Sequence, residues 1–453
     1  MEKTKKGIFN ADVDLLNGPI FKSLVIFAIP LLISNIFQQF YNTADTMIVG
    51  NYLGDVSLAA IGSCTSIYDL LVGFALGIGN GLSIVTARSF GSGDHDLLKK
   101  SVASSIVIGI VSSIVITIIG IIILHPLLQL LDTPANIIDE AYSYISVITL
   151  FIIVMFAYNL CAGLMRAIGN SIMPLVFLIV SSCVNVGLDI LFITSFDMGI
   201  QGAAIATVIS QGVSVLLCII YILNKTPILI PTKEHFKVDK KLYIELLGQG
   251  FSMGFMSSIV SAGSVILQYG INGLGYLTIA GHTAARKLYM FFNMPFTAMA
   301  MAISTFVSQN KGANQGKRIR LALRYAYIYD VIVAMIVSLI LLFGASSLVR
   351  LISGSTEAIV INNGSLYLQI VGPFYMILGI LMQTRYALQG IGQKMLPLIS
   401  SVIEFVGKII FVVIFIPRFQ YMAVIFFFFF IWCVMAIQLV YSFYSNKYIK
   451  SVK

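Results

Sequence analysis

The sequence IGNSIMPL at residues 168–175 returns as IGQKMLPL at residues 391–398, with Ile, Gly, Pro and Leu in register at an offset of 223. A second pair supports the first: ARSFGSGDHDLLKKS begins at residue 87, and SQNKGANQGKRIRLA begins at residue 308, an offset of 221. Both segments of the second pair are basic, Gly-containing turns that lead into a helix. The chain is therefore predicted to contain two repeated halves, which are joined near residues 224–241.

Composition assigns the chain to the membrane. Of its 453 residues 58% are hydrophobic and only 10% are charged, against roughly 25% charged residues in soluble domains. Continuous apolar runs of about 20 residues are long enough to cross a bilayer as helices, whereas barrel strands alternate in polarity. We predict an all-α integral membrane protein with twelve spans, at residues 20–49, 56–86, 101–124, 139–163, 172–195, 200–223, 243–271, 276–308, 322–346, 359–384, 396–416 and 420–444.

The distribution of Lys and Arg predicts the topology. Basic residues gather before the first span, in alternate connections and in the C-terminal tail, which by the positive-inside rule makes both termini cytoplasmic. Each half then has six spans and the same orientation, as in parallel repeats related by a pseudo-twofold axis along the membrane normal. We predict an N-terminal lobe at 1–223, a cytoplasmic linker at 224–241 and a C-terminal lobe at 242–453. This architecture favours a transporter over a channel.

The net charge of +9 lies in those cytoplasmic segments. There it orients the protein and meets anionic lipid, so it is weak evidence for a nucleic-acid partner. The five cysteines all lie within predicted spans at spacings that fit no metal site, and we expect them to be buried as small apolar side chains: Cys64, Cys161, Cys183, Cys218 and Cys433. The three glycines of the GIGNG run at 77–81 are expected to allow close helix packing.

Two carboxylates are out of place in hydrocarbon. Asp45 and Asp189 lie in otherwise uncharged apolar stretches, where each costs about 3 kcal/mol on the lenient insertion scale. Gln38 and Asn42 recur with Asp45 at helical spacing, and Asn185 lies one turn before Asp189. We interpret these two helix faces as halves of one cation site.

The second half lacks this acidic pair. At the 223-residue offset, Asn185 corresponds to Lys408, Asp189 to Val412 and Ser181 to Glu404. A coordinated cation is therefore expected in the N-terminal lobe.

The segment PIFKSLVIFAIPLLISNIFQQFYNTADTMIVGNYLGDVSLAAIG at 19–62, followed by GIGNGLSIVTARSFGSGD at 77–94, resembles the first two helices of bacterial multidrug and toxic compound extrusion (MATE) transporters. The resemblance covers essentially the whole chain. It implies a twelve-helix, two-lobed exporter that exchanges Na⁺ or H⁺ for cationic, amphiphilic drugs. Relatives with a cation site in the N-terminal lobe use an Asp in the first helix, an Asn and an Asp one turn apart in the fifth, and a Thr in the sixth. The resemblance implies that Asp45, Asn185, Asp189 and Thr207 play these roles here. The acids that some relatives carry in the seventh and tenth helices are missing here, which puts a C-terminal cation site of that kind in doubt.

The residues do not choose between the two ions. Na⁺ needs several hard oxygen ligands, whereas a proton needs only a suitable carboxylate. The alternative is structural: two neutralised carboxyls that hydrogen-bond helices together. No cofactor beyond the coupling ion is expected.

Other polar residues are candidates for a substrate cavity. Asp69 is either a counter-charge to a cationic drug or a helix-packing residue. Glu404 and Lys408, one turn apart, are expected to pair with each other, with a gating or substrate role as the alternative. Tyr41 and the run that includes Met294 could supply an adaptable lining, although a lipid-facing role is the default, as it is for the Phe426–Phe430 block.

Four further residues keep more than one interpretation. His282 is a proton relay or, more simply, a hydrogen-bonded helix residue. Arg286 and Lys287 snorkel, line the cavity, or pair with Asp330 or Glu404. Asp330 itself is expected to form a structural ion pair near a basic loop, with a functional role as the alternative.

The predicted function is secondary active multidrug efflux by a monomer in the bacterial cell membrane, without enzymatic activity. The nearest alternative, a lipid-linked oligosaccharide flippase of the same superfamily, would want Arg or Lys in its cavity for a pyrophosphate head group. A membrane polyprenyl transferase would need Asp-rich metal motifs, and the loop acids Asp94 and Asp96 form none.

Overall fold

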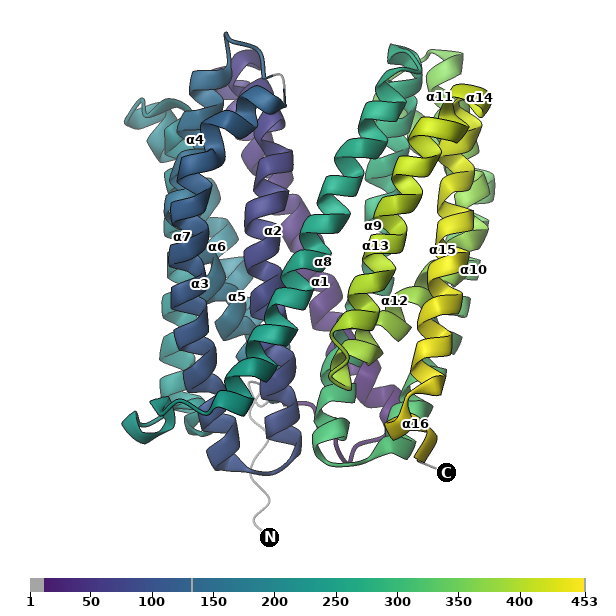
Figure 1. Cartoon of the computed structure of the whole chain (residues 1–453). Coiled ribbons are helices and arrows are strands. Elements are labelled where there is room, and N and C mark those ends of the chain that lie inside the picture. Colours follow the sequence, from purple (N-terminus) through teal and green to yellow (C-terminus); the bar gives the residue numbers. More distant parts are fainter. Residues whose placement is uncertain (1–11, 132, 452–453) are drawn as a thin grey trace. The chain divides into compact units, whose positions relative to one another are not determined.

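The computed structural model describes residues 12–131 and 133–451, and helices make up nearly all of this part (Figure 1). Eleven of the described helices are long and apolar enough to cross a membrane, and a bent pair, α4 (Ile138–Leu150) and α5 (Ile152–Ala167), provides a twelfth span. The predicted all-α class and the twelve spans are confirmed.

The remaining helices of the first half are α1 (Ile20–Leu53), α2 (Asp55–Gly91), α3 (His95–Leu130), α6 (Ile172–Ile190) with the π-helix η1 (Leu191–Ser195), and α7 (Gly199–Lys225). The short 3₁₀ turns η2 (Pro227–Leu229) and η3 (Lys233–Phe236) lie in the connection. The second half contains α8 (Lys240–Asn272), α9 (Tyr276–Gly312), α10 (Gly316–Ser353), α11 (Ala358–Val371), η4 (Gly372–Phe374), α12 (Tyr375–Gly390), α13 (Met395–Ile410), the π-helix η5 (Phe411–Phe415), α14 (Ile416–Phe419), α15 (Tyr421–Ser445) and α16 (Lys447–Ser451).

Several helices run past the predicted ends of their spans. The second span was predicted to end at residue 86 and α2 continues to Gly91, while α10 begins at Gly316, six residues before the predicted start. Hydropathy marks only the segment that fits the hydrocarbon, whereas the backbone hydrogen bonds of a helix continue into the polar zone.

Contacts group the chain into two compact units. Unit 1 comprises the chain up to Ser258 together with Ser308–Asn314, and unit 2 comprises Ile259–Val307 and the chain from Gln315 onward. Two of the three divisions along the chain fall inside helices, α8 and α9, so the units do not share the bounds of the lobes inferred from the repeat. The lobe bounds inferred from the sequence repeat, 1–223 and 242–453, therefore remain a prediction.

The repeat is visible in the backbone. Gly169 and Gly392, equivalent at the 223-residue offset, both have left-handed φ angles, of 98° and 93°. In this turn only glycine avoids strain, and a Cβ at position 169 would lie 2.6 Å from the Val13 carbonyl oxygen. The helices that follow start at Ile172 and Met395, again 223 apart, and both end in a π-helix. The two halves therefore share local geometry as well as sequence.

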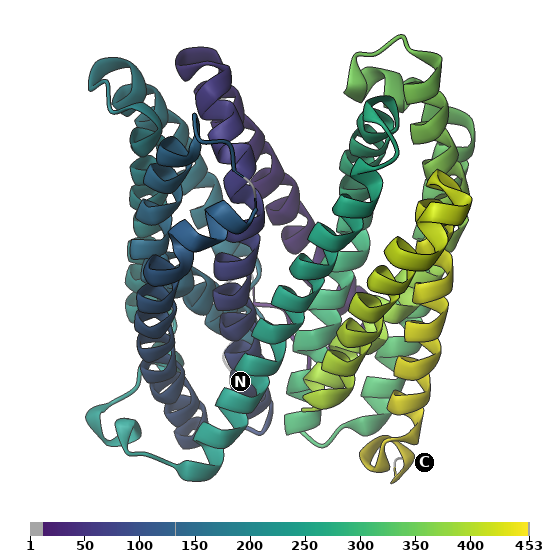
Figure 2. The same cartoon turned by 45° about the horizontal axis from the view of Figure 1, so that its top comes forward.

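Within unit 1, α2 is the central helix and contacts α1, α3, α4 and α5, while α6 packs against α1 and α7. The long helices of the unit run side by side in both views (Figures 1 and 2). A Cβ on Gly77 would lie 2.7 Å from the Met253 carbonyl oxygen of α8, and one on Gly81 would lie 2.6 Å from that of Gln249. The predicted packing role is confirmed for Gly77 and Gly81, because only glycine lets the two backbones approach this closely. A Cβ on Gly79, in contrast, would come no nearer than 3.8 Å to a neighbour.

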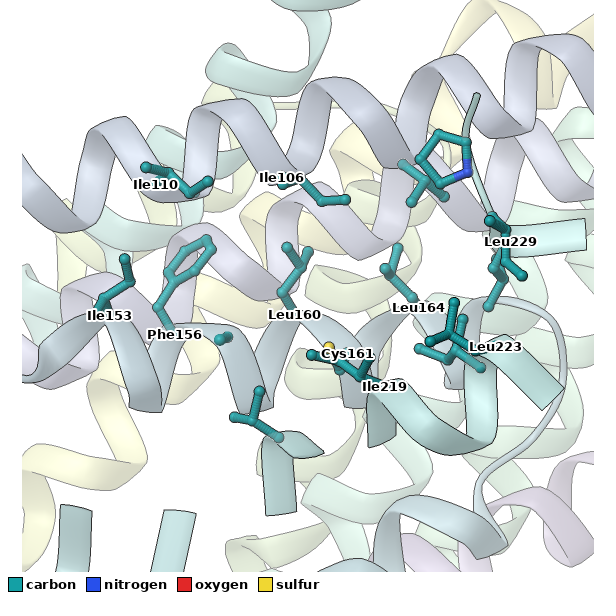
Figure 3. Close-up of a pocket in the computed structure, with 17 residues that line it drawn as sticks. Ile106, Ile110, Ile153, Phe156, Leu160, Cys161, Leu164, Ile219, Leu223 and Leu229 are labelled. Atoms are coloured by element: carbon teal, nitrogen blue, oxygen red, sulfur yellow. The ribbon is translucent and has the colours of Figure 1, made fainter. Parts of the chain in front are cut away.

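An apolar cavity of about 410 Å³ lies between α3, α5, α7 and the η2 turn of unit 1. Figure 3 shows Ile106 and Ile110 of α3 facing Phe156 and Leu160 of α5 across it. Its lining side chains are apolar apart from the thiol of Cys161. The cavity therefore has no oxygen ligands with which to hold a small ion.

Within unit 2, α12 lies against α10 and α15, and α15 also contacts α11 and α13. Phe427 of the phenylalanine block is 1% exposed and packs on the Phe411 ring, whereas Phe426 and Phe430 are exposed. The lipid-facing default is therefore wrong for Phe427.

The five cysteines are all free thiols. Cys64 and Cys218 are buried as predicted, but Cys183 is exposed. That prediction is wrong because α6 turns residue 183 away from its neighbours, an orientation that hydropathy does not report.

Candidate functional site

Asp45 of α1 and Asp189 of α6 come together where these two helices pack. Their carboxyl groups lie within electrostatic range of one another, and their residues are only 8% and 0% exposed. Two ionised carboxylates at such close range repel each other, and burial adds to the cost of their charges. The pair therefore requires a proton or another cation.

Asn185 lies one turn before Asp189 on α6 and is completely buried. Both polar atoms of its amide lack a hydrogen-bond partner, as do both carboxyl oxygens of Asp189 and the Oδ1 atom of Asp45. Buried polar atoms are nearly always paired. Asn185 and the two carboxyls therefore concentrate buried polar atoms that have no partner in the protein.

The π-helix η1 begins two residues after Asp189. Such segments widen the helix by one residue per turn and occur often at functional sites. The η1 segment therefore follows Asp189 almost immediately in the sequence.

Thr207 brings α7 into the same cluster. Its hydroxyl donates to the Ala203 carbonyl at 3.0 Å and accepts from the Tyr41 hydroxyl at 3.5 Å. Tyr41 is also within electrostatic range of both Asp45 and Asp189. The structure thus gathers all four residues of the predicted cation pattern, with Tyr41 beside them.

Gln38 and Asn42 do not join this buried cluster. Both are exposed, whereas Asp45 is buried. Their helical spacing with Asp45 therefore does not bring them into the buried cluster, which Tyr41 joins instead. As exposed polar groups they remain substrate candidates only.

Among the described residues, no basic side chain forms an ion pair with Asp45 or Asp189. The ion pairs of 4 Å or less lie elsewhere and include Lys100 with Asp96, and Lys408 with Glu404. These ion pairs therefore do not neutralise the two carboxyls.

Two tyrosines near the cluster were missed at the sequence level. Tyr68 of α2 and Tyr144 of α4 both lie within electrostatic range of Asp45. Nothing in the sequence distinguishes them from the other tyrosines, since their proximity comes from how α2 and α4 pack on one another.

The remaining substrate candidates lie on three different helices, α2, α9 and α13. Asp69 is exposed on α2, and Met294 of α9 is buried at 8% exposure. Lys408 donates to Glu404 at 2.8 Å, which confirms the predicted intrahelical pair. The Lys408 side chain also packs on Gly263 of α8, where a Cβ would meet its Cδ atom at 2.9 Å.

The basic residues of α9 do not have the suggested partners. Glu404 pairs with Lys408, and Asp330 accepts a hydrogen bond from Gln383 at 3.1 Å. The predicted ion pair of Asp330 is wrong, because α10 directs this side chain toward α12 and away from the basic loop. Arg286 is half-buried and Lys287 is exposed.

His282 is buried, and its Nδ1 atom lies 3.2 Å from the Tyr421 hydroxyl. Its ring also packs edge-on against Tyr367. These contacts agree with the simpler expectation of a hydrogen-bonded helix residue.

A repeated bundle of membrane-spanning helices with buried, unpaired acids among its spans is the architecture of a secondary transporter. The MatE family model matches residues 30–191 and again residues 253–414, two segments that start 223 residues apart. The chain belongs to the MATE family of membrane transporters.

Individual relatives agree with this assignment. The chain is 29% identical over 312 residues to the probable multidrug resistance protein YoeA of Bacillus subtilis, covering 67% of each chain. It is 26% identical over 394 residues to YpnP, a probable multidrug resistance protein of the same bacterium, covering 86% of this chain and 87% of the relative. The fold is similar to the crystal structure of MATE in the bent conformation, with a TM-score of 0.87 at 22% identity over 97% of this chain and 98% of that one.

Proposed function

We propose that the chain is a cation-coupled multidrug antiporter, which takes up Na⁺ or H⁺ and exports cationic, amphiphilic molecules. YoeA and YpnP are named as probable multidrug resistance proteins, which supports drugs as the exported molecules. The coupling ion would bind at Asp45, Asn185, Asp189 and Thr207. We place the carrier in the bacterial cell membrane as a monomer with both termini in the cytoplasm.

The observation that carries this proposal is the buried acidic pair. Asp45 and Asp189 face each other without a basic neighbour, beside an amide whose two polar atoms are unpaired. A cation between them would neutralise the charge, and the oxygens of Asn185 and Thr207 would complete its shell. A proton would act by allowing one carboxyl to donate to the other.

Coupling follows from electrostatics between helices. With a cation bound, α1, α6 and α7 are held together through oxygens from all three helices. Without it, the two carboxylates repel and favour a different packing of these helices. Because a ligand shifts an equilibrium only by its differential affinity for the two states, the drug must favour the state that the ion disfavours, or compete for the same carboxylates.

The acidic cluster argues against the flippase alternative. A pyrophosphate head group would need basic side chains, and the buried charges that unit 1 gathers at this site are carboxyls. The same carboxyls suit a cargo with positive charge.

The test is drug efflux from proteoliposomes with Na⁺ and proton gradients imposed separately. Wild-type protein should export ethidium with at least one of the gradients, and Asp189→Asn should abolish gradient-driven export while the protein still folds. Asp139→Asn is the matched control, since it removes an exposed acid at the start of α4. Wild-type rates in Asp189→Asn, or equal losses in both variants, would overturn the proposal.

A further inference from the structure

A third buried acid, besides Asp45 and Asp189, lies in unit 2. Asp330 of α10 is 0% exposed and packs directly on the backbone of α12, where a Cβ added to Gly379 would lie 2.7 Å from the Asp330 Cβ and Cγ atoms. One turn further along α12, the Gln383 amide donates to the Asp330 Oδ1 atom at 3.1 Å. Gly379 thus makes room for the carboxyl that Gln383 binds.

The arrangement leaves two oxygens unpaired. Asp330 Oδ2 and Gln383 Oε1 are both buried without a hydrogen-bond partner, and Gln383 is itself 0% exposed. No Lys, Arg or His in the described ranges forms an ion pair with Asp330. An uncompensated carboxylate in such surroundings is costly, so the group needs a cation or a proton.

The groups that face Asp330 are few and uncharged. From α12 they are Gln383 and the backbone of Gly379, and on α10 itself the phenols of Tyr327 and Tyr329 lie within electrostatic range. The Tyr327 hydroxyl is engaged with Thr384 at 2.6 Å.

Comparison with unit 1 argues against a general packing role. At the 223-residue offset, Gly379 and Gln383 correspond to Phe156 and Leu160, which line the apolar cavity in Figure 3. At the 221-residue offset that relates residues 87 and 308, Asp330 corresponds to Gly109, where an added Cβ would overlap the Phe156 ring. At the equivalent contact unit 1 therefore packs an apolar ring against a glycine, so the fold does not require a carboxyl here.

We infer that Asp330 and Gln383 form a second binding site for a monovalent cation, H⁺ or Na⁺, in unit 2. The Gln383 amide also donates to the Phe296 carbonyl at 3.3 Å, next to the proline at position 295 within α9. Proline removes one helical hydrogen bond and permits a bend. Occupancy of the site is thereby linked to the packing of α9, α10 and α12. The inference goes beyond the proposed function, since it concerns other residues and a different unit.

The test measures the carboxyl directly by infrared difference spectroscopy on purified full-length protein in detergent. The parent variant is Asp45→Asn/Asp189→Asn, which removes the acidic pair of unit 1, and it is compared with the same protein carrying Asp330→Asn in addition. One arm varies pH without Na⁺, and the other adds Na⁺ at constant pH. A carboxyl signal that responds in either arm of the parent and is missing after Asp330→Asn supports the site and identifies its ion.

Identical spectra of the two proteins in both arms would overturn the inference. To calibrate the infrared signal of a single carboxyl, Asp139→Asn is added to the same parent variant and its difference spectrum is recorded. If the triple variant does not fold, the difference between wild type and Asp330→Asn alone gives the same readout, because asparagine preserves the shape of the side chain. The result does not depend on drug transport, so it can fail or succeed separately from the antiporter proposal.

Discussion

The two units share a backbone pattern but keep their polar chemistry at different positions. Unit 1 has Asn185 and Asp189 where unit 2 has Lys408 and Val412. Asp330 of unit 2, in turn, has Gly109 as its equivalent at the 221-residue offset of this region. The equivalent turns, helix starts and π-helices recur in both units. The comparison teaches that a repeat can preserve geometry while each copy acquires its own buried charges.

The difference has a physical reason. Helix packing in a membrane depends on close fit and tolerates many apolar substitutions. A buried acid is tolerated only if its partner, its space and its counter-charge are present together. Gly379 supplies the space and Gln383 the hydrogen-bond partner for Asp330, whereas the equivalent positions of unit 1 hold Phe156 and Leu160.

The largest effect is expected at Lys408, the unit 2 equivalent of Asn185. Lys408→Met should destabilise the protein by about 3 kcal/mol, because it leaves the largely buried Glu404 without a partner. Chemical unfolding in detergent measures the change. The double variant Glu404→Gln/Lys408→Met should recover most of it, and a loss below about 1 kcal/mol in Lys408→Met would mean that the pair is not desolvated.

The next effect concerns unit 1. A saturating coupling ion, at about 100 times its Kd, should stabilise wild-type protein by about 2.7 kcal/mol, and Asp189→Asn should remove this stabilisation. Thermal unfolding with and without Na⁺, and across pH, reports it. Combining Asp45→Asn with Asp189→Asn should add little further loss, since the two carboxyls bind as a unit. Full additivity would indicate that the two carboxyls belong to separate sites. That result would contradict the single acidic pair on which the comparison of the two units depends.

A smaller effect is expected at the helix contact of unit 2. Gly379→Ala should cost about 1–3 kcal/mol by overpacking, because the new methyl group would meet Asp330 at 2.7 Å. Gly344→Ala on α10 is the control, since its Cβ would come no nearer than 3.8 Å to a neighbour. Equal stability of the two variants would show that α10 and α12 can separate without penalty.

The smallest effect is expected for Tyr41→Phe. It removes a long hydrogen bond to Thr207 at 3.5 Å and leaves the ring in place. The loss in stability should be below about 1 kcal/mol, and the affinity for the coupling ion should fall by less than about tenfold. A larger fall in ion affinity would make Tyr41 a direct ligand.

Much of the fold could be read from the sequence. The spans follow from apolar runs of bilayer length, and the repeat follows from IGNSIMPL and IGQKMLPL. Asp45 and Asp189 could be singled out because a carboxylate in an apolar run is costly wherever the helix lies. The intrahelical pair of Glu404 and Lys408 followed from their spacing alone.

The sequence could not provide the contacts between helices. It grouped Gln38 and Asn42 with Asp45, although Tyr41 is the residue that reaches Thr207, and it expected an ion pair for Asp330, which instead meets Gln383. Helical periodicity defines a stripe of residues but not the neighbour that covers it.

The sequence by itself determined the membrane class, the twelve helices, the repeat and which acids are out of place, because these properties depend on the transfer of side chains and backbone from water to hydrocarbon. Only the tertiary structure decided that Asp45 faces Asp189 across α1 and α6, and that Gly379 opens space for Asp330. Such contacts depend on how each helix is rotated about its own axis, which is set by the fit of all its neighbours at once.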